Sequence, residues 1–255
     1  MLPREHGAYG QVFFPLLTAF AVAGVARPSI FTAIAVVALF LAHEPLLMLL
    51  GHRGRRDQAA RAGRAWWSLM ACVMVATATG VLAIDATRAD LRWTFVLPLV
   101  PAIWLFVAIV TGREKTVSAE AAVAMAFAGA AIPLCAGTGR VTAGIVIAGA
   151  YALVFILGTL TVRVIVLRTR AGGNPDAVRR TQLATFAVAA LGAFIALAGA
   201  ADGVVSWLAV AAILPAVAFA SALAAYPPPA TRLKRVGWSL VAVTAATAVL
   251  LVAAV

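Results

Sequence analysis

The chain has 255 residues, of which 64% are apolar and 11% are charged, and its mean hydropathy is +1.03. Soluble domains are about 45–50% apolar and about 25% charged, so a soluble fold of this size is excluded. The apolar residues form continuous runs of about 20 residues instead of alternating ten-residue strands, which excludes a transmembrane barrel. We therefore expect an all-α, polytopic membrane protein that forms a single transmembrane domain over residues 1–255.

Nine apolar runs follow one another along the chain, separated by glycine, proline and charged residues that end helices. Each run is long enough to cross a hydrocarbon core of about 30 Å, although the first and last are marginal. The runs cover residues 11–26, 29–50, 65–84, 93–111, 118–136, 142–167, 181–200, 204–225 and 236–255.

The basic residues are distributed unevenly between alternate connections. With the N-terminus inside, sixteen of the 20 Lys and Arg residues fall in inner segments and only Arg27, Arg88, Arg92 and Arg140 fall outside. This split follows the positive-inside rule. It predicts an N-inside, C-outside protein of the bacterial inner (plasma) membrane. It also accounts for the net charge of +11 without nucleic acid as a partner.

His43 and Glu44 lie within the second apolar run. Glu44 is six residues before the end of that run at Leu50. At 1.5 Å per residue, Glu44 is about 9 Å from the inner end. A carboxylate at this depth is costly unless it faces a partner or a wet cavity. Pro45 follows and removes one helical hydrogen bond, which favours a kink beside the pair. The pair is interpreted either as a functional group or as part of a buried ion pair that locks two helices together.

Arg163 is the second charge inside an apolar run. It lies about one turn from Arg168, and snorkelling of its guanidinium to the interface is one interpretation. Pairing with Glu44 is another. Thr159 and Arg163 are four residues apart and share a helix face, so together they suit an anionic headgroup or a phosphate.

Two further polar segments are expected on the inner side. The first surrounds His6, where Gly7 and Gly10 permit a close backbone approach to the site. The second surrounds Lys115 and is interpreted as a solvated loop or as part of the site. The chain contains no Walker loop, CxxC or HExxH motif. The histidines lack metal-ligand spacing, so no metal site is expected, and the sequence does not identify a cofactor.

Two stretches carry a resemblance to a known family: Pro3-Arg4-Glu5-His6-Gly7-Ala8-Tyr9-Gly10-Gln11 and Ala42-His43-Glu44-Pro45. They resemble the YwiC-like family of bacterial membrane proteins, whose members open with a similar basic, His-Gly-Ala-containing segment. The length and the hydropathy fit that family along the whole chain.

The nine-span layout is also similar to that of the UbiA superfamily of intramembrane prenyltransferases. Those enzymes bind an isoprenoid diphosphate through Mg²⁺ at Asp-rich motifs near the inner ends of their second and sixth helices. Here His43-Glu44 and Thr159 to Arg163 occupy the corresponding places. The chain has neither Asp-rich motif, and Arg163 places a cation where those enzymes have an acid.

The leading hypothesis is a UbiA-like protein with a cytoplasm-facing polar cavity for an amphipathic lipid-like substrate such as an isoprenoid, quinone or porphyrin. Glu44 or His43 would be the catalytic acid–base group. Arg163, Lys115 and Arg168 would bind an anionic head, assisted by Thr159 and His6. Whether the protein transfers a group stays open. The alternatives are a small-solute or proton-coupled transporter that titrates Glu44 and a non-catalytic membrane partner or assembly factor.

Overall fold

The computed structural model describes residues 6–52, 54–169 and 174–255, without the side chains of residues 6, 7, 55–57, 59 and 60. All regular elements in these ranges are helices, which confirms the all-α prediction. Eight helices are long and apolar enough to cross a membrane, and a shorter apolar helix, α1 (His6–Ala23), precedes them. The chain is therefore a multi-pass helical membrane protein.

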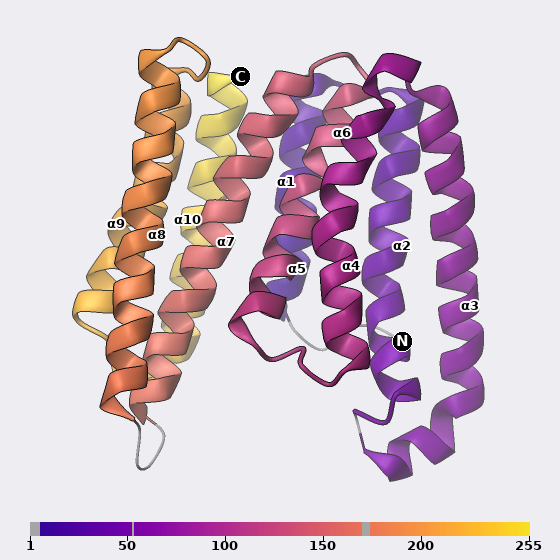
Figure 1. The fold of residues 1–255 in the computed structure, drawn as a ribbon, viewed down its shortest axis with the longest axis horizontal. Coiled ribbons are helices and arrows are strands. Elements are labelled where there is room, and N and C mark those ends of the chain that lie inside the picture. The colour runs from indigo at the N-terminus through magenta and orange to yellow at the C-terminus, as the bar shows by residue number, and fades with distance from the viewer. Residues whose placement is uncertain (1–5, 53, 170–173) are drawn as a thin grey trace. The chain divides into compact units, whose positions relative to one another are not determined.

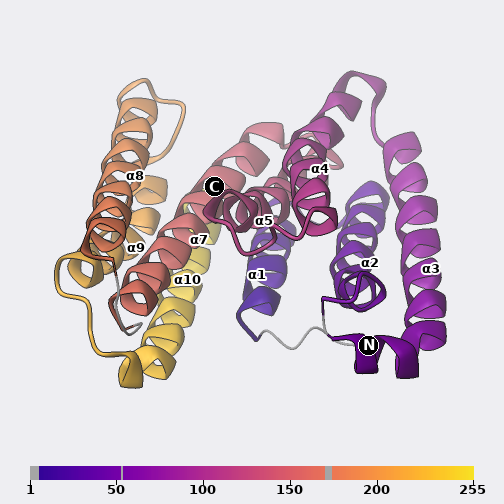
Figure 2. The same ribbon diagram turned by 60° about the horizontal axis from the view of Figure 1, so that its bottom comes forward.

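The chain divides into two compact units, unit 1 (Met1–Ala148) and unit 2 (Gly149–Val255), and the boundary falls within helix α7. Figures 1 and 2 show the helices from two directions. Each unit is described by itself below.

Unit 1 contains two long helical hairpins and a short buried helix (Figure 1). Its elements are α1, α2 (Arg27–Leu49), α3 (Arg55–Ala86), η1 (Ala89–Phe95), α4 (Val96–Val110), α5 (Val117–Gly129), α6 (Ala131–Ala136) and the start of α7 (Val141–Thr169). Helix α3 packs along α2, and α4 packs along α5. Every residue of α6 is buried, and α6 contacts α1, α2 and η1. This short helix closes one end of unit 1.

Aromatic rings join α1, α2 and α5. The ring centroid of Tyr9 lies 5.1 Å from that of Phe40, in a T-shaped contact. Phe40 in turn makes a T-shaped contact with Phe127 at 5.8 Å. Edge-to-face rings at these distances attract one another beyond the area they bury. The three rings therefore fix which faces of α1, α2 and α5 meet.

Unit 2 is a bundle of the remaining part of α7 with α8 (Pro175–Ala201), α9 (Trp207–Ala225), η2 (Ala230–Arg232) and α10 (Leu233–Ala254). Leu157, Ala189 and Ala220 form a buried core between α7, α8 and α9. Thr247 of α10 donates a buried hydrogen bond of 2.9 Å to the Ala212 carbonyl of α9. Such a bond stabilises a membrane bundle, because the hydrophobic effect provides little driving force for helices to associate within lipid.

Successive connections are predicted to alternate between the two sides of the membrane, and contacts within each unit support this prediction. In unit 1, His52 of the α2–α3 turn pairs with Glu114 of the α4–α5 loop, and Arg140 before α7 donates to the Val22 carbonyl at the end of α1. In unit 2, Arg168 at the end of α7 donates to the Pro227 carbonyl between α9 and α10. Each contact joins connections that the nine-span prediction places on one side of the membrane. Which side faces the cytoplasm stays a prediction.

The helices differ from the predicted spans mainly at their polar ends. Helix α3 begins at Arg55, whereas the apolar run begins at residue 65. Hydropathy marks only the part of a helix that lies in lipid, and the alanines and arginines before it have high helix propensity. Similarly, the run predicted over residues 118–136 forms α5 and α6, with a one-residue turn at Ala130. Pro133 lacks the N–H that would bond to the Gly129 carbonyl, which explains the interruption.

Candidate functional site

Glu44 is the most deeply buried acid among the described side chains, with 4% of its surface exposed. It lies in α2, five residues before the helix ends at Leu49, or about 7.5 Å inside that end. Pro45 lies within the helix and is buried, while His43 is half-buried. Burial of an acid in an apolar helix is costly, and such residues are a functional-site hypothesis by default.

The aromatic contacts show which neighbours the Glu44 face of α2 meets. Glu44 is four residues after Phe40 and therefore shares its face, which contacts α1 through Tyr9 and α5 through Phe127. Glu120 is seven residues before Phe127, two turns along the same face of α5. Helices α2 and α5 run in opposite directions (Figure 1), so Glu44 near the end of α2 and Glu120 near the start of α5 lie toward the same end of unit 1.

Glu120 also has a local structural role. It lies in the first turn of α5, where Thr116 caps the helix by accepting a hydrogen bond of 3.3 Å from the Ala119 amide. An acid in the first turn interacts favourably with the helix dipole. Glu120 is half-buried, whereas Glu44 is buried and lies near the C-terminal end of its helix, where the dipole opposes a negative charge. The helix dipole therefore stabilises a negative charge at Glu120 but does not stabilise one at Glu44.

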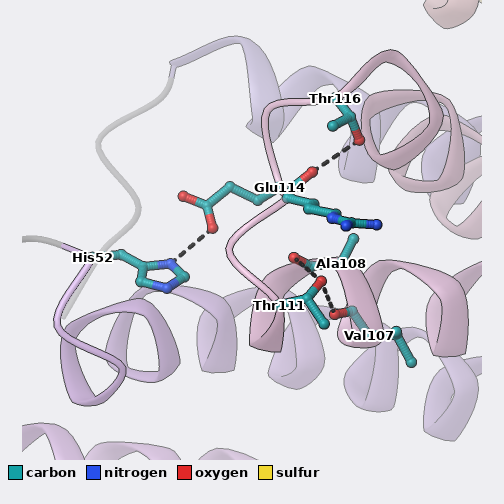
Figure 3. A network of polar contacts seen from close by, with 7 residues as sticks. His52, Val107, Ala108, Thr111, Glu114 and Thr116 are labelled. Atoms are coloured by element: carbon teal, nitrogen blue, oxygen red, sulfur yellow. Dashed lines mark hydrogen bonds and ion pairs between the residues drawn. The ribbon is translucent and has the colours of Figure 1, made fainter.

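His52 and Glu114 form a close polar contact that sequence reasoning did not predict (Figure 3). The His52 Nδ1 lies 2.8 Å from the Glu114 Oε2, and the two side chains are 22% and 21% exposed. The Oε2 atom is buried and forms no other hydrogen bond with the described residues. The pair holds the α4–α5 loop against the α2–α3 turn. The signal in the sequence was a histidine and an acid in two connections expected on one side of the membrane.

Hydrogen bonds within the α4–α5 loop fix its shape beside this pair. The Thr116 hydroxyl donates to the Arg113 carbonyl at 2.8 Å, and the Thr111 hydroxyl donates to the Val107 carbonyl at 2.8 Å (Figure 3). Lys115 is exposed in this ordered loop, at the same end of unit 1 as Glu44. His6 begins α1, but its side chain lies outside the described residues.

The opposite end of unit 1 is tightly packed. The Ser29 hydroxyl of α2 donates 2.7 Å to the Leu134 carbonyl of α6. A Cβ at Gly137 would lie 2.7 Å from the Ser29 Oγ, and one at Gly144 would lie 2.8 Å from the Ile132 Cα. Only glycine fits such close approaches. The end closed by α6 is therefore the far end from Glu44.

Unit 2 holds the other predicted site residues. Arg163 and Thr159 are half-buried on α7, and Arg168 is exposed in its last turn, with its Nη1 2.8 Å from the Pro227 carbonyl oxygen. Arg163 and Thr159 share a helix face, as their spacing predicts. Because Glu44 belongs to unit 1, its predicted approach to Arg163 stays a prediction.

Among the described side chains, no three His, Cys, Asp or Glu residues gather closely enough to hold a metal ion.

The comparison with protein families agrees with the motifs at the N-terminus and in α2. The model of the YwiC-like protein family matches residues 2–135, which is more than half of the chain. The matched region contains α1 to α5 and most of α6, and it includes His43 and Glu44. No curated protein and no solved structure matches the chain, so its likeness to the UbiA layout stays a prediction. The chain belongs to the YwiC-like protein family.

Proposed function

We propose that unit 1 binds an amphipathic lipid-like molecule, such as an isoprenoid, a quinone or a porphyrin, in a site that opens at the Glu44 end. The observation that carries this proposal is the burial of Glu44, which is 4% exposed inside an apolar helix. Ionisable residues inside membrane spans are rare, and by default they mark functional sites. In a bacterium, the plasma membrane would hold both the protein and its ligand.

The surroundings of Glu44 suit a ligand with a polar head and an apolar body. Phe40 lies one turn deeper than Glu44 and Phe127 two turns deeper than Glu120, and Tyr9 adds a third ring against Phe40. Lys115 lies exposed at the same end, where it would attract an anionic head. In this arrangement the apolar body would lie toward the aromatic rings and the head toward the loops.

Glu44 would act as the acid–base group, with His43 next to it on α2. Its carboxylate would accept the proton of an acceptor hydroxyl as that oxygen bonds to the transferred group. The bond between that group and its leaving group would break, and the leaving group would depart with the proton from Glu44. Group transfer is the reaction class we propose, because the predicted layout is that of an intramembrane transferase. Close packing around α6 at the other end of unit 1 favours a binding site that opens to one face. A transport path through unit 1 would need an opening at both ends.

The proposal is tested by ligand-induced thermal stabilisation of the purified full chain. The probes are farnesyl diphosphate, a short-chain ubiquinone and protoporphyrin IX, each at saturating concentration in the same detergent. A ligand present at 100 times its Kd stabilises a protein by about 2.7 kcal/mol, so we expect one probe to raise Tm by several degrees. Glu44→Gln keeps the shape of the side chain and should abolish that rise without lowering the Tm of the free protein.

Asp85→Asn is the control, because it neutralises an exposed carboxylate at the end of α3, away from the aromatic cluster and the α4–α5 loop. It should retain the rise in Tm. Equal rises in the wild type and in Glu44→Gln, or no rise with any of the three probes, would contradict the proposal. A large fall in the Tm of free Glu44→Gln would instead assign Glu44 a structural role.

A further inference from the structure

One end of unit 2 carries an excess of exposed positive charge. Six exposed cations come from the last turn of α7, the first turns of α8, η2 and the first turn of α10. Asp176 is the exposed acid among the described residues of these segments. We name these six cations the basic end of unit 2; they are Arg168, Arg179, Arg180, Arg232, Lys234 and Arg235.

Two hydrogen bonds hold these segments at one end of the unit. The Gln182 Nε2 of α8 donates 2.7 Å to the Ala224 carbonyl in the last turn of α9, and the Arg168 Nη1 donates 2.8 Å to the Pro227 carbonyl. The C-terminal end of α7, the start of α8 and the α9–α10 connection therefore meet. Within the described part of the chain, the other five cations form no ion pair.

The position of these cations along the spans identifies their partner. Arg179 and Arg180 lie within the first six residues of the apolar span Pro175–Ala201, and Lys234 and Arg235 within the first six of Ala230–Ala254. At 1.5 Å per residue they lie about 9 Å or less from the helix ends, at the depth of lipid headgroups. Trp238 is 68% exposed one turn further along α10, where an indole anchors a helix at the membrane interface.

We infer that the basic end of unit 2 binds the phosphate headgroups of anionic phospholipids. Guanidinium groups bind phosphate oxygens through two parallel N–H donors, which suits a cluster made mainly of arginine. A nucleic acid would also be attracted by positive charge. It would have to reach residues that are flanked by lipid, which favours the headgroup as the phosphate source.

The test is a titration of the purified full chain with phosphatidylglycerol and with phosphatidylcholine of identical acyl chains, followed by native mass spectrometry. We expect the Kd for phosphatidylglycerol to be lower by at least about tenfold, because each cation near an anionic surface contributes about fivefold. The triple variant Arg179→Gln/Arg180→Gln/Arg235→Gln should lose this preference. The charge-conserving variant Arg179→Lys/Arg180→Lys/Arg235→Lys should keep part of it, because lysine retains the charge but lacks the paired donors of the guanidinium.

The matched control is Arg61→Gln/Arg64→Gln/Arg113→Gln, which removes three exposed arginines from unit 1. It should retain the preference for phosphatidylglycerol. Inorganic phosphate and a single-stranded oligonucleotide, each at millimolar phosphate, should not displace the bound lipid. Equal affinity for the two lipids, an equal loss in the unit 1 control, or displacement by either competitor would overturn the inference.

Discussion

At the residue scale, the packing of unit 1 depends on glycines that face backbone atoms of a neighbouring helix. Gly144 of α7 is a clear case, because a Cβ there would meet the Ile132 Cα at 2.8 Å and the Ala131 carbonyl oxygen at 3.0 Å. Backbone atoms of α6 cannot rotate away as the end of a side chain can. The buried α6 therefore keeps its place only if residue 144 has no side chain.

Gly144→Ala should lower the free energy of unfolding by roughly 1–3 kcal/mol, the usual cost of forcing an extra methyl group into a packed core. Gly149→Ala is the matched control in the same helix, since no atom lies within 4 Å of its added Cβ. It should leave stability unchanged or raise it by up to about 1 kcal/mol, because alanine favours helix. Unfolding in mixed micelles measures both, and equal effects of the two substitutions would refute this account of α6.

The burial of Glu44 could be anticipated from the sequence, because few positions of the second apolar run are polar and the depth follows from the helical rise. The residues that surround Glu44 could not be anticipated. Facing residues of α2 and α5 are chosen by lateral packing, and here the contact between Phe40 and Phe127 decides it. The pairing of His52 with Glu114 escaped prediction for the same reason: a sequence places loops on one side but does not say which loops touch.

At the element scale, the His52–Glu114 pair holds the α4–α5 loop at the end where Glu44 lies. Both side chains are partly exposed, so the pair should contribute about 0.2–1 kcal/mol in a double-mutant cycle of His52→Gln and Glu114→Gln. We also expect faster hydrogen exchange over residues 111–116 in either variant. Arg88→Gln breaks the exposed Arg88–Asp90 pair elsewhere in unit 1 and serves as the control. Unchanged loop exchange in His52→Gln would show that the pair does not hold the loop.

In unit 2, hydroxyl groups distinguish bonds between helices from bonds within one helix. The Thr247 hydroxyl bonds to Ala212 of α9, whereas the Thr244 hydroxyl bonds to the Leu240 carbonyl of its own helix at 2.8 Å. Thr247→Val should therefore lower the free energy of unfolding by about 0.6–1.7 kcal/mol, the range for interhelical bonds in membrane proteins. Thr244→Val should cost less. The reverse order would contradict this assignment of the α9–α10 contact.

Hydropathy predicted the elements better than it predicted their ends. Polar residues at the start of α3 continue the helix beyond the apolar run, and Pro133 divides one predicted span into α5 and α6. A span is defined by what lipid tolerates, whereas a helix is defined by backbone hydrogen bonds. The predicted span and the observed helix coincide in the middle of each apolar run. They differ at the polar ends of the run and at prolines.

At the scale of the whole molecule, the uneven distribution of basic residues predicts the orientation. Single cysteines at Lys115 and Tyr226 should be labelled only from the cytoplasm, and single cysteines at Asp202 and Val255 only from outside. Cys72 and Cys135 are both free and would first be replaced. Membrane-impermeant maleimide on intact cells and on inverted vesicles reads out the side. Labelling of all four positions from one side, or in the reverse pattern, would refute the N-inside, nine-span topology.

The central claim is that buried Glu44 belongs to a site that binds a lipid-like molecule. Native mass spectrometry of the full chain extracted from its own membrane, with identification of what dissociates from it, tests this most directly. We expect a molecule with an apolar body and a polar head to leave the wild type and Asp85→Asn on activation, and to be absent from Glu44→Gln at equal Tm. The same molecule on all three proteins, or none on the wild type, would contradict the claim.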